Sequence, residues 1–259
     1  MAGNQIERAL GVLEQLAGAG EGLALQTLAD RLNIPKSATH RMLAELVRLG
    51  YVRQDDMTGR YRLSTRLIAL GFRQLAHIGA DVVQPILDRL AETSGELVRL
   101  GVVEPRRLTW IAKSQGARSG LRYDPDMGRE APLFCTASGQ AWLACMSDED
   151  ALERVRQQYA ESADIVTGPN APRDDQALLE CLVQARARGY AWVIESSAIG
   201  MSALAAVVVH PQQGHPLGVL SIAGPSARLP EARIHELAPA LIAASKELSD
   251  ASQASEFFA

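Results

Sequence analysis

The stretch that decides the fold runs from residue 35 to residue 63 and reads PKSATHRMLAELVRLGYVRQDDMTGRYRL. Its helical part has two different ends, because the first turns are small, polar or basic and the later turns are apolar. Such a helix packs its C-terminal half and presents its N-terminal half, as the second helix of a helix-turn-helix does in a major groove. The candidate DNA-contacting residues of this helix are Lys36, Ser37, Thr39, His40 and Arg41.

The rest of the stretch predicts a β-hairpin. Residues 51–53 and 61–63 alternate apolar and basic side chains around a turn, in which Gly59 can supply a positive φ. A hairpin that follows a helix-turn-helix forms the wing of a winged DNA-binding domain. Arg60 and Arg62 lie near its tip, where we expect them to contact a phosphate or an adjacent minor groove.

Apolar stripes at helical spacing also precede this stretch. They predict one helix over residues 5–17, ended by the run GAGEG, and a second from Leu25 to Leu32. Pro35 suits the first position of the next helix, where its missing N–H is not needed. A small helical domain with merely solvated basic residues is the alternative, but the order of helices, basic helix start and basic hairpin favours DNA binding.

Length and charge agree with a DNA-binding module attached to a larger domain. A chain of 259 residues that is 47% hydrophobic is longer than the usual single domain, so two domains are expected. The net charge of −4 opposes a nucleic-acid partner, but residues 36–66 hold seven basic and three acidic side chains. That segment therefore carries +4 and the remaining 228 residues carry −8, and local charge is what a phosphate backbone feels.

The sequence also excludes some classes of protein. It has neither an apolar run long enough to span a membrane nor the layout of a signal peptide, so we expect a soluble, cytoplasmic protein without a membrane partner. Cys135, Cys145 and Cys181 are an odd number at spacings that match neither a disulfide framework nor a zinc site. They are expected to be buried fillers, and no metal or cofactor is expected.

A further apolar stripe covers residues 65–78 and predicts a helix between the domains. The helix is long enough to separate the domains, and its stripe is apolar enough to pair with a second copy of the chain. Alternatively, the stripe packs on its own domain. The stripe consists of Leu67, Ile68, Leu70, Leu75 and Ile78.

The pattern after residue 81 mixes helices and strands, which predicts a sheet covered on at least one face. Helices are expected over residues 82–94, 138–146, 148–159, 174–188 and 231–249, and strands over 96–103, 108–113, 190–195, 203–210 and 217–223. The predicted organisation is a winged helix-turn-helix domain over 1–64, a linker helix over 65–80, a second domain over 81–250 and a flexible tail over 251–259.

The run from Leu25 through LADRLNIPKSATHRMLAELVRLGYVRQD to TGRYRLS resembles the DNA-binding domain of the IclR family of bacterial regulators. Blocks farther along resemble its effector domain: DVVQPILDRLAETSGELVRLGVVE, PLFCTASGQAWLA, RGYAWVIESSAIGMSALAAVVV and GVLSIAGPSARL. The resemblance implies an α+β protein with a winged helix-turn-helix, a linker helix and an α/β effector domain related to GAF and PAS sensor folds. It further implies a repressor or an activator that binds a pseudo-palindromic operator in double-stranded DNA as a homodimer or a dimer of dimers.

The resemblance also indicates where an effector binds. In relatives that bind small organic acids, the ligand lies between a TASG-like turn, here residues 136–139, and the later sheet. A helix start there offers unpaired N–H groups to a carboxylate. The corresponding candidate residues are Ser138, Gly139, Gln140, Trp142, Val193, Glu195, Ala203, Ser221 and Ala223.

Three of these positions depart from the polar residues that such relatives often carry. Val193, Ala203 and Ala223 lack hydrogen-bonding side chains, so a polar ligand group opposite them would go unpaired at a cost of about 1–3 kcal/mol. We therefore expect an effector that is an aromatic or otherwise apolar carboxylate. The alternative is that the substitutions only repack the core.

Two rival functions differ from this one. A ligand-independent DNA-binding protein would show the same first domain. For an enzyme, the best nucleophile or base candidates are Cys135, Ser138, His210 and His215, but Ser138 lies in T-A-S-G rather than in a G-x-S-x-G elbow. No phosphate-binding glycine loop is present either, so no catalysis is expected.

Overall fold

The computed structural model describes residues 5–78, 82–125, 127–161 and 165–258. The chain divides into two compact units, the first ending at residue 79 and the second beginning at residue 80. Each unit is described by itself. Within the described ranges, no helix is both long and apolar enough to cross a membrane.

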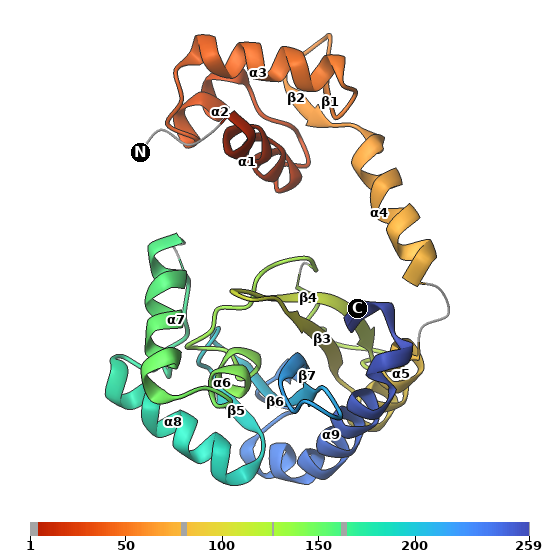
Figure 1. Cartoon of the computed structure of the whole chain (residues 1–259), viewed down its shortest axis with the longest axis vertical. Coiled ribbons are helices and arrows are strands. Elements are labelled where there is room, and N and C mark those ends of the chain that lie inside the picture. Colours follow the sequence, from red (N-terminus) through yellow and green to blue (C-terminus); the bar gives the residue numbers. More distant parts are fainter. Residues whose placement is uncertain (1–4, 79–81, 126, 162–164, 259) are drawn as a thin grey trace. The chain divides into compact units, whose positions relative to one another are not determined.

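The first unit packs helices against a short antiparallel hairpin (Figure 1). Its helices are α1 (Gln5–Ala17), α2 (Leu25–Arg31), α3 (Lys36–Arg48) and α4 (Thr65–Ile78), and its strands are β1 (Val52–Gln54) and β2 (Tyr61–Leu63). Val12, Leu28 and Leu43 are fully buried where α1, α2 and α3 meet. The predicted winged helix-turn-helix is therefore present.

The turn between α2 and α3 and the turn of the hairpin have backbone conformations that suit their residue types. Asn33 has a left-handed φ of 51° in the turn between α2 and α3. Pro35 is the N-cap of α3 rather than its first residue, and its carbonyl oxygen accepts hydrogen bonds from the amides of Ala38 and Thr39. In the wing, Gly59 has the expected positive φ, at 66°. The turn geometry at both joints therefore follows from the residue types there.

Helix α4 covers the predicted linker segment. Ile68 and Leu70 are 58% and 41% exposed on it. The side chains of Leu75 and Ile78, which complete the predicted stripe, lie outside the described residues.

The second unit is built around a five-stranded antiparallel sheet with the order β4-β3-β7-β6-β5. Its strands are β3 (Leu97–Val103), β4 (Leu108–Gln115), β5 (Ala191–Ile194), β6 (Met201–Val209) and β7 (Pro216–Pro225). Its helices are α5 (Val83–Ser94), α6 (Ala137–Leu143), α7 (Asp148–Glu161), α8 (Asp175–Arg188) and α9 (Glu231–Ala251).

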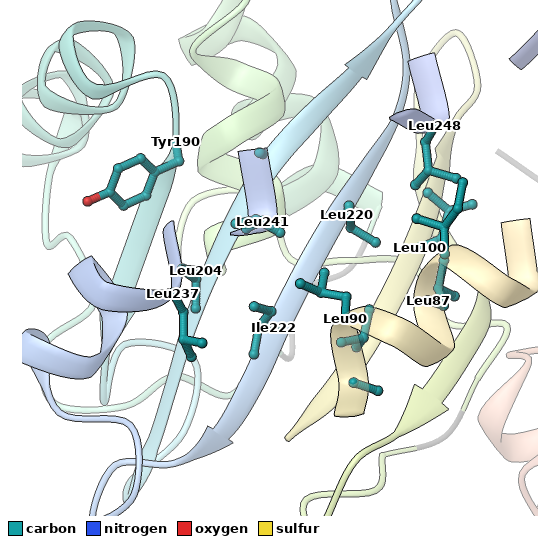
Figure 2. Packing of buried hydrophobic residues seen from close by; sticks show 14 of the residues in the cluster. Leu87, Leu90, Leu100, Tyr190, Leu204, Leu220, Ile222, Leu237, Leu241 and Leu248 are labelled. Atoms are coloured by element: carbon teal, nitrogen blue, oxygen red, sulfur yellow. The ribbon is translucent and has the colours of Figure 1, made fainter. Parts of the chain in front are cut away.

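One face of the sheet packs against α5 and α9. Figure 2 shows Leu100, Leu220 and Ile222 of the sheet among leucines of these two helices. Gly95 ends α5 in the left-handed conformation, with φ of 70°, and turns the chain directly into β3. The alternate residues of each strand thus form one continuous apolar layer with α5 and α9.

The opposite face packs against α6 and α8. Trp110, Ala205 and Val219 of the sheet lie in one apolar cluster with Leu143 of α6 and Leu182 of α8. Because both faces are covered, the central strands are nearly continuous apolar runs rather than alternating ones. The predicted elements are present, with ends that differ by a few residues.

A β-bulge interrupts the pairing of β3 with β4. Leu100 pairs with Ala112, but the next residue, Gly101, pairs with Trp110, so Ile111 is an extra residue on β4. Successive side chains of a strand point to opposite faces, and a one-residue slip exchanges the faces. The bulge therefore brings Trp110 onto the same sheet face as Arg99.

The end of the chain differs from the flexible tail that the sequence predicts. Short 3-10 turns cover Ser252–Ala254 and Glu256–Phe258. Phe257 and Phe258 pack against the cluster beneath α5 and α9, and Ser252 and Ser255 are buried. Partial burial of the two aromatic rings favours this ordered end over a mobile one.

The layer between the sheet and α9 yields a stability prediction. Replacing the fully buried Leu220 by alanine should lower the free energy of unfolding by about 2–5 kcal/mol, through lost burial and the cavity left behind. Urea unfolding followed by tryptophan fluorescence measures this unit specifically, because Trp110, Trp142 and Trp192 all lie in it. Val183→Ala, at a position that is 56% exposed, is the control and should change the value by less than about 0.5 kcal/mol. Equal effects of the two variants would contradict the packing described.

Candidate DNA-contacting surface and effector cavity

One stripe of α3 faces solvent along its whole length. It consists of Ser37, Arg41, Ala44 and Arg48, which recur at intervals of three and four residues and therefore share a helix face. Lys36 and His40 are exposed beside the first turn of the stripe.

Thr39 corrects the sequence-based set. It is fully buried on the opposite side of α3, and its hydroxyl donates a hydrogen bond to the carbonyl oxygen of Pro35 at 3.2 Å. A threonine whose hydroxyl bonds to the preceding turn can be packed inward without an unpaired polar group. Thr39 thus supports the helix and does not present itself to a ligand.

The wing presents a different set of cations from the one that the sequence suggests. Arg60 is exposed, but the side chain of Arg62 is only 30% exposed and lies 3.5 Å from the carboxylate of Glu21. Arg53, which pairs with Arg62 across the hairpin, is exposed and was missed as a candidate. The alternation of residues 51–53 was the signal for it, since the inward Val52 places its neighbours outward.

The remaining cations of the segment have local partners. Arg48 donates to Glu45 at 2.8 Å, and this pairing raises the pKa of Arg48 and lowers that of Glu45. Arg66 donates to the carbonyl oxygen of Leu49 at 2.7 Å and stacks over Tyr51. The cations for which the described residues show neither an ion pair nor a side-chain hydrogen bond are Lys36, Arg41, Arg53 and Arg60.

The second unit contains a cavity of about 430 Å³ on the sheet face that carries α6. Arg99, Trp110, Ala203 and Ala223 form its floor on the sheet. The other lining residues come from the segments around it: Tyr123, Pro125, Arg129, Glu130, Pro132, Thr136, Ala137, Ile165, Val166, Ser197, Met201 and Ser202. A cavity of this size holds a small organic ligand.

The turn before α6 lies at this cavity, but through different residues from the predicted ones. Thr136 and Ala137 line it. Ser138 is 2% exposed, and a Cβ at Gly139 would lie 2.2 Å from the carbonyl oxygen of Leu133. The amide of Gly139 already donates to Oγ1 of Thr136 at 3.0 Å. Ser138 and Gly139 therefore belong to the packing of α6 against the neighbouring segment.

The other predicted effector residues divide between the cavity and the packing around it. Ala203 and Ala223 line the cavity. The hydroxyl of Ser221 is buried and donates to the carbonyl oxygen of Arg99 at 3.4 Å. Trp142 is buried in the core between the sheet and α8.

Three further candidates lie away from this cavity. The side-chain Nε2 of Gln140 donates to the carbonyl oxygen of Phe134 at 2.8 Å, and Gln140 lines a separate cavity with Val193. Glu195 has a φ of 52° and accepts a hydrogen bond from the amide of Gly200, so it holds the turn between β5 and β6. The structure does not bring these side chains to the cavity of Arg99.

Arg99 is the main cavity residue that the sequence reasoning missed. Its guanidinium carbon lies 3.7 Å from the centre of the Trp110 ring and 5.6 Å from that of Tyr123. Burial lowers the pKa of Arg99, and the neighbouring Tyr123 raises it again in part. An arginine inside an otherwise apolar buried strand was the available signal.

The residues that suggested an enzyme have poor surroundings for catalysis. Burial raises the pKa of the Cys135 thiol to about 12, which leaves it protonated at neutral pH. The rings of His210 and His215 stack on each other, 5.1 Å apart, where β6 turns into β7. No cluster of metal-binding side chains occurs among the described residues.

Two family models match the sequence. Residues 5–56 match the model described as the IclR helix-turn-helix domain. Residues 75–250 match the model described as bacterial transcriptional regulator IclR C-terminal.

Individual proteins agree with these matches. The chain is 30% identical to the acetate operon repressor of Salmonella typhimurium over 249 residues, which covers 94% of this chain and 88% of that protein. A crystal structure of a regulator from Alicyclobacillus acidocaldarius has a TM-score of 0.77 at 25% identity and covers 96% of this chain and 98% of that one. A homologue from Microbacterium hydrocarbonoxydans, crystallised with 4-hydroxybenzoate, shares the fold with a TM-score of 0.72 at 21% identity, covering 97% and 100%.

The surroundings of the cysteines predict their order of reaction. Burial raises the pKa of the Cys135 thiol to about 12, so it stays protonated at pH 8, and the side chain is fully buried. Iodoacetamide should therefore alkylate the exposed Cys145 in the native protein and reach Cys135 only after urea is added. Peptide mass spectrometry measures both sites in one sample, and rapid native alkylation of Cys135 would show that its thiol is accessible and activated.

Proposed function

Since the chain belongs to the IclR family of bacterial transcriptional regulators, with an effector-binding C-terminal domain, we propose that α3 and the wing bind an operator sequence. A carboxylate with an aromatic or otherwise apolar body binds in the cavity and controls the binding of DNA. The described relatives are regulators rather than enzymes, and this chain is a regulator. The observation that carries the proposal is a set of α3 and wing cations with no ion pair among the described residues: Lys36, Arg41, Arg53 and Arg60.

The solvent-facing stripe of α3 supports the assignment of DNA contacts. Ser37 and Arg41 lie one turn apart near the N-terminal end of the helix, where a recognition helix meets base edges. Lys36 and His40 flank them, and Arg53 and Arg60 extend the cationic surface onto the wing. In this assignment Arg41 contacts bases and Arg60 contacts phosphates, because an exposed arginine at a wing tip reaches the backbone of the duplex.

Two copies of the chain are expected to act together on a pseudo-palindromic site, since one winged domain covers only a few base pairs. Ile68 and Leu70 on α4 are exposed and offer an apolar surface to a second copy. Ile6 and Leu10 on α1 are 66% and 53% exposed and add to the apolar surface of this unit.

The proposed effector class rests on the walls of the cavity. Ala203 and Ala223 form an apolar floor next to Trp110. A ligand group facing these alanines gains by being apolar, because a polar group there would lose its hydrogen bonds to water. Binding must also favour one arrangement of the linker helices over another, since a ligand with equal affinity for both arrangements shifts nothing.

The DNA-contact assignment predicts different losses for two arginines. Arg41→Ala should weaken binding to a duplex selected by the wild-type protein from random sequences by about 5- to 150-fold, with little loss on a scrambled duplex. Arg60→Ala should weaken both duplexes alike and reduce the slope of log K against log salt by about 1. Fluorescence anisotropy at a series of salt concentrations measures both quantities.

Arg106→Ala is the matched control, because Arg106 is an exposed arginine of the second unit. Thr39→Val tests the inward placement of Thr39 and should bind the selected duplex as the wild type does, since the buried hydroxyl faces away from the stripe. Wild-type affinities for both Arg41→Ala and Arg60→Ala would refute the docking of α3 and the wing.

The effector class predicts a preference among ligands. Benzoate and 4-hydroxybenzoate should bind at least about ten times more tightly than pyruvate or glyoxylate, because each polar group left unpaired costs about 1–3 kcal/mol. Titration calorimetry measures the affinities. A ligand present at a hundred times its dissociation constant should also stabilise the native protein by about 2.7 kcal/mol in differential scanning.

Binding of the short keto acids alone would contradict the proposed class. DNA binding that no member of the panel changes, together with no thermal stabilisation, would favour a ligand-independent DNA-binding protein. Each readout uses the full chain.

A further inference from the structure

Arg99 is a buried cation for which the described residues provide no counter-ion. Its side chain is 5% exposed, and its Nε and Nη1 atoms have no hydrogen-bond partner among the described residues. An arginine remains protonated in a protein even when burial disfavours its charge. The full positive charge therefore lies in the wall of the cavity.

Among the described residues, two acidic side chains at or near this cavity have other partners. Glu130 lines the cavity, but its Oε1 accepts from the amide of Gln158 at 2.8 Å and its Oε2 lies 3.7 Å from Arg107. Asp124, next to Tyr123, pairs with Lys113. The described residues provide no ion pair for Arg99.

Glu96, on the segment leading into β3, is a buried charge that does have an ion-pair partner. Its two carboxylate oxygens accept from Nε and Nη2 of Arg228, at 2.6 and 2.8 Å. Arg228 also donates to the carbonyl oxygen of Leu121, which ties the segment before Tyr123 to the sheet. Glu96 is thus satisfied within the protein, whereas Arg99, three residues later, is not.

The neighbours of Arg99 orient its guanidinium: Tyr123 is a hydrogen-bond partner of the side chain, and Nε and Nη1 have no partner among the described residues. The guanidinium lies over the ring of Trp110, and the bulge in β4 is what places that ring on the same face. A guanidinium carries its N–H groups in its own plane, so a stacked one directs them sideways rather than into the ring. A buried charge without a partner destabilises the folded state. Residues that lower stability in this way are expected at functional sites.

We propose that Arg99, stacked on Trp110, binds the anionic group of the effector, and that this residue makes the cavity selective for anions over their neutral analogues. The inference rests on the proposed function and changes where the carboxylate lies: on strand β3, not at the turn before α6. The complementary ligand has one anionic group at Arg99 and a flat apolar body against Ala203, Ala223 and the aliphatic side chains of Ile165 and Val166.

The test compares matched pairs of probes on matched variants. The pairs are benzoate with benzamide, phenylacetate with phenylacetamide, and 4-hydroxybenzoate with 4-hydroxybenzamide. Arg99→Met removes the charge and keeps an unbranched apolar side chain, and Arg99→Gln keeps polarity without charge. Arg154→Met is the control, since Arg154 also stacks on a tryptophan, Trp142, but does not line the cavity.

The wild type should bind at least one carboxylate more tightly than its amide. Both Arg99 variants should weaken that carboxylate by about 10- to 100-fold and leave the amide unchanged, as expected for the loss of a charge-assisted hydrogen bond. Arg154→Met should change neither. Titration calorimetry on the full chain gives these values.

Stability without ligand is the second readout. Because Arg99 has no counter-ion in the part of the chain that the structure describes, the urea midpoint of Arg99→Met or Arg99→Gln should equal or exceed that of the wild type. Lower midpoints for both variants would show a structural role and overturn the proposal. Unchanged carboxylate affinity in the variants, or a wild type that binds only amides or none of the carboxylates, would overturn it too. Binding of the wild-type protein to operator DNA tests the proposed function separately, because it does not depend on the outcome at Arg99.

Discussion

Helices cover both faces of the central sheet in the second unit, and this two-sided burial constrains everything built on it. Val98 and Leu100 of β3 pack beneath α5 and α9, while Val219 of β7 packs beneath α6. A strand enclosed in this way is apolar along its length, and any charged side chain in it loses water on all sides. The charges that such a sheet does contain are therefore informative, because the fold tolerates them only with compensation.

Glu96 and Arg99 show two forms of that compensation within three residues of the sequence. Glu96 forms a two-pronged ion pair with Arg228, which fixes the segment before Tyr123 against the sheet. Arg99 receives the face of an aromatic ring and an adjoining cavity instead. One charge thus stabilises the wall of the cavity, and the other is available to a ligand within it.

The first unit positions its candidate DNA-contacting residues on a much smaller hydrophobic core. A small core around Val12, Leu28 and Leu43 holds three helices and a hairpin in position, and the cations stay outside it. The net charge of the chain is −4 because the acidic residues outside this segment outnumber its cations, so the total does not indicate the local positive charge. Because screening limits electrostatic attraction to about 10 Å, the local charge of a recognition surface matters more than the total.

The sequence by itself determined the type and order of the elements, since the 3.6-residue and two-residue periods, the N-capping Pro35 and the glycine stops are local properties. The winged helix-turn-helix and the helices and strands of the second unit were all readable in this way. Which side chains share a face was decided by the tertiary structure. Thr39 turned inward because its hydroxyl bonds to the preceding turn, and Ser138 packed against a neighbouring segment. Arg99 met Trp110 only because one extra residue in β4 exchanges the faces, and strand register depends on contacts between distant segments that no local pattern encodes.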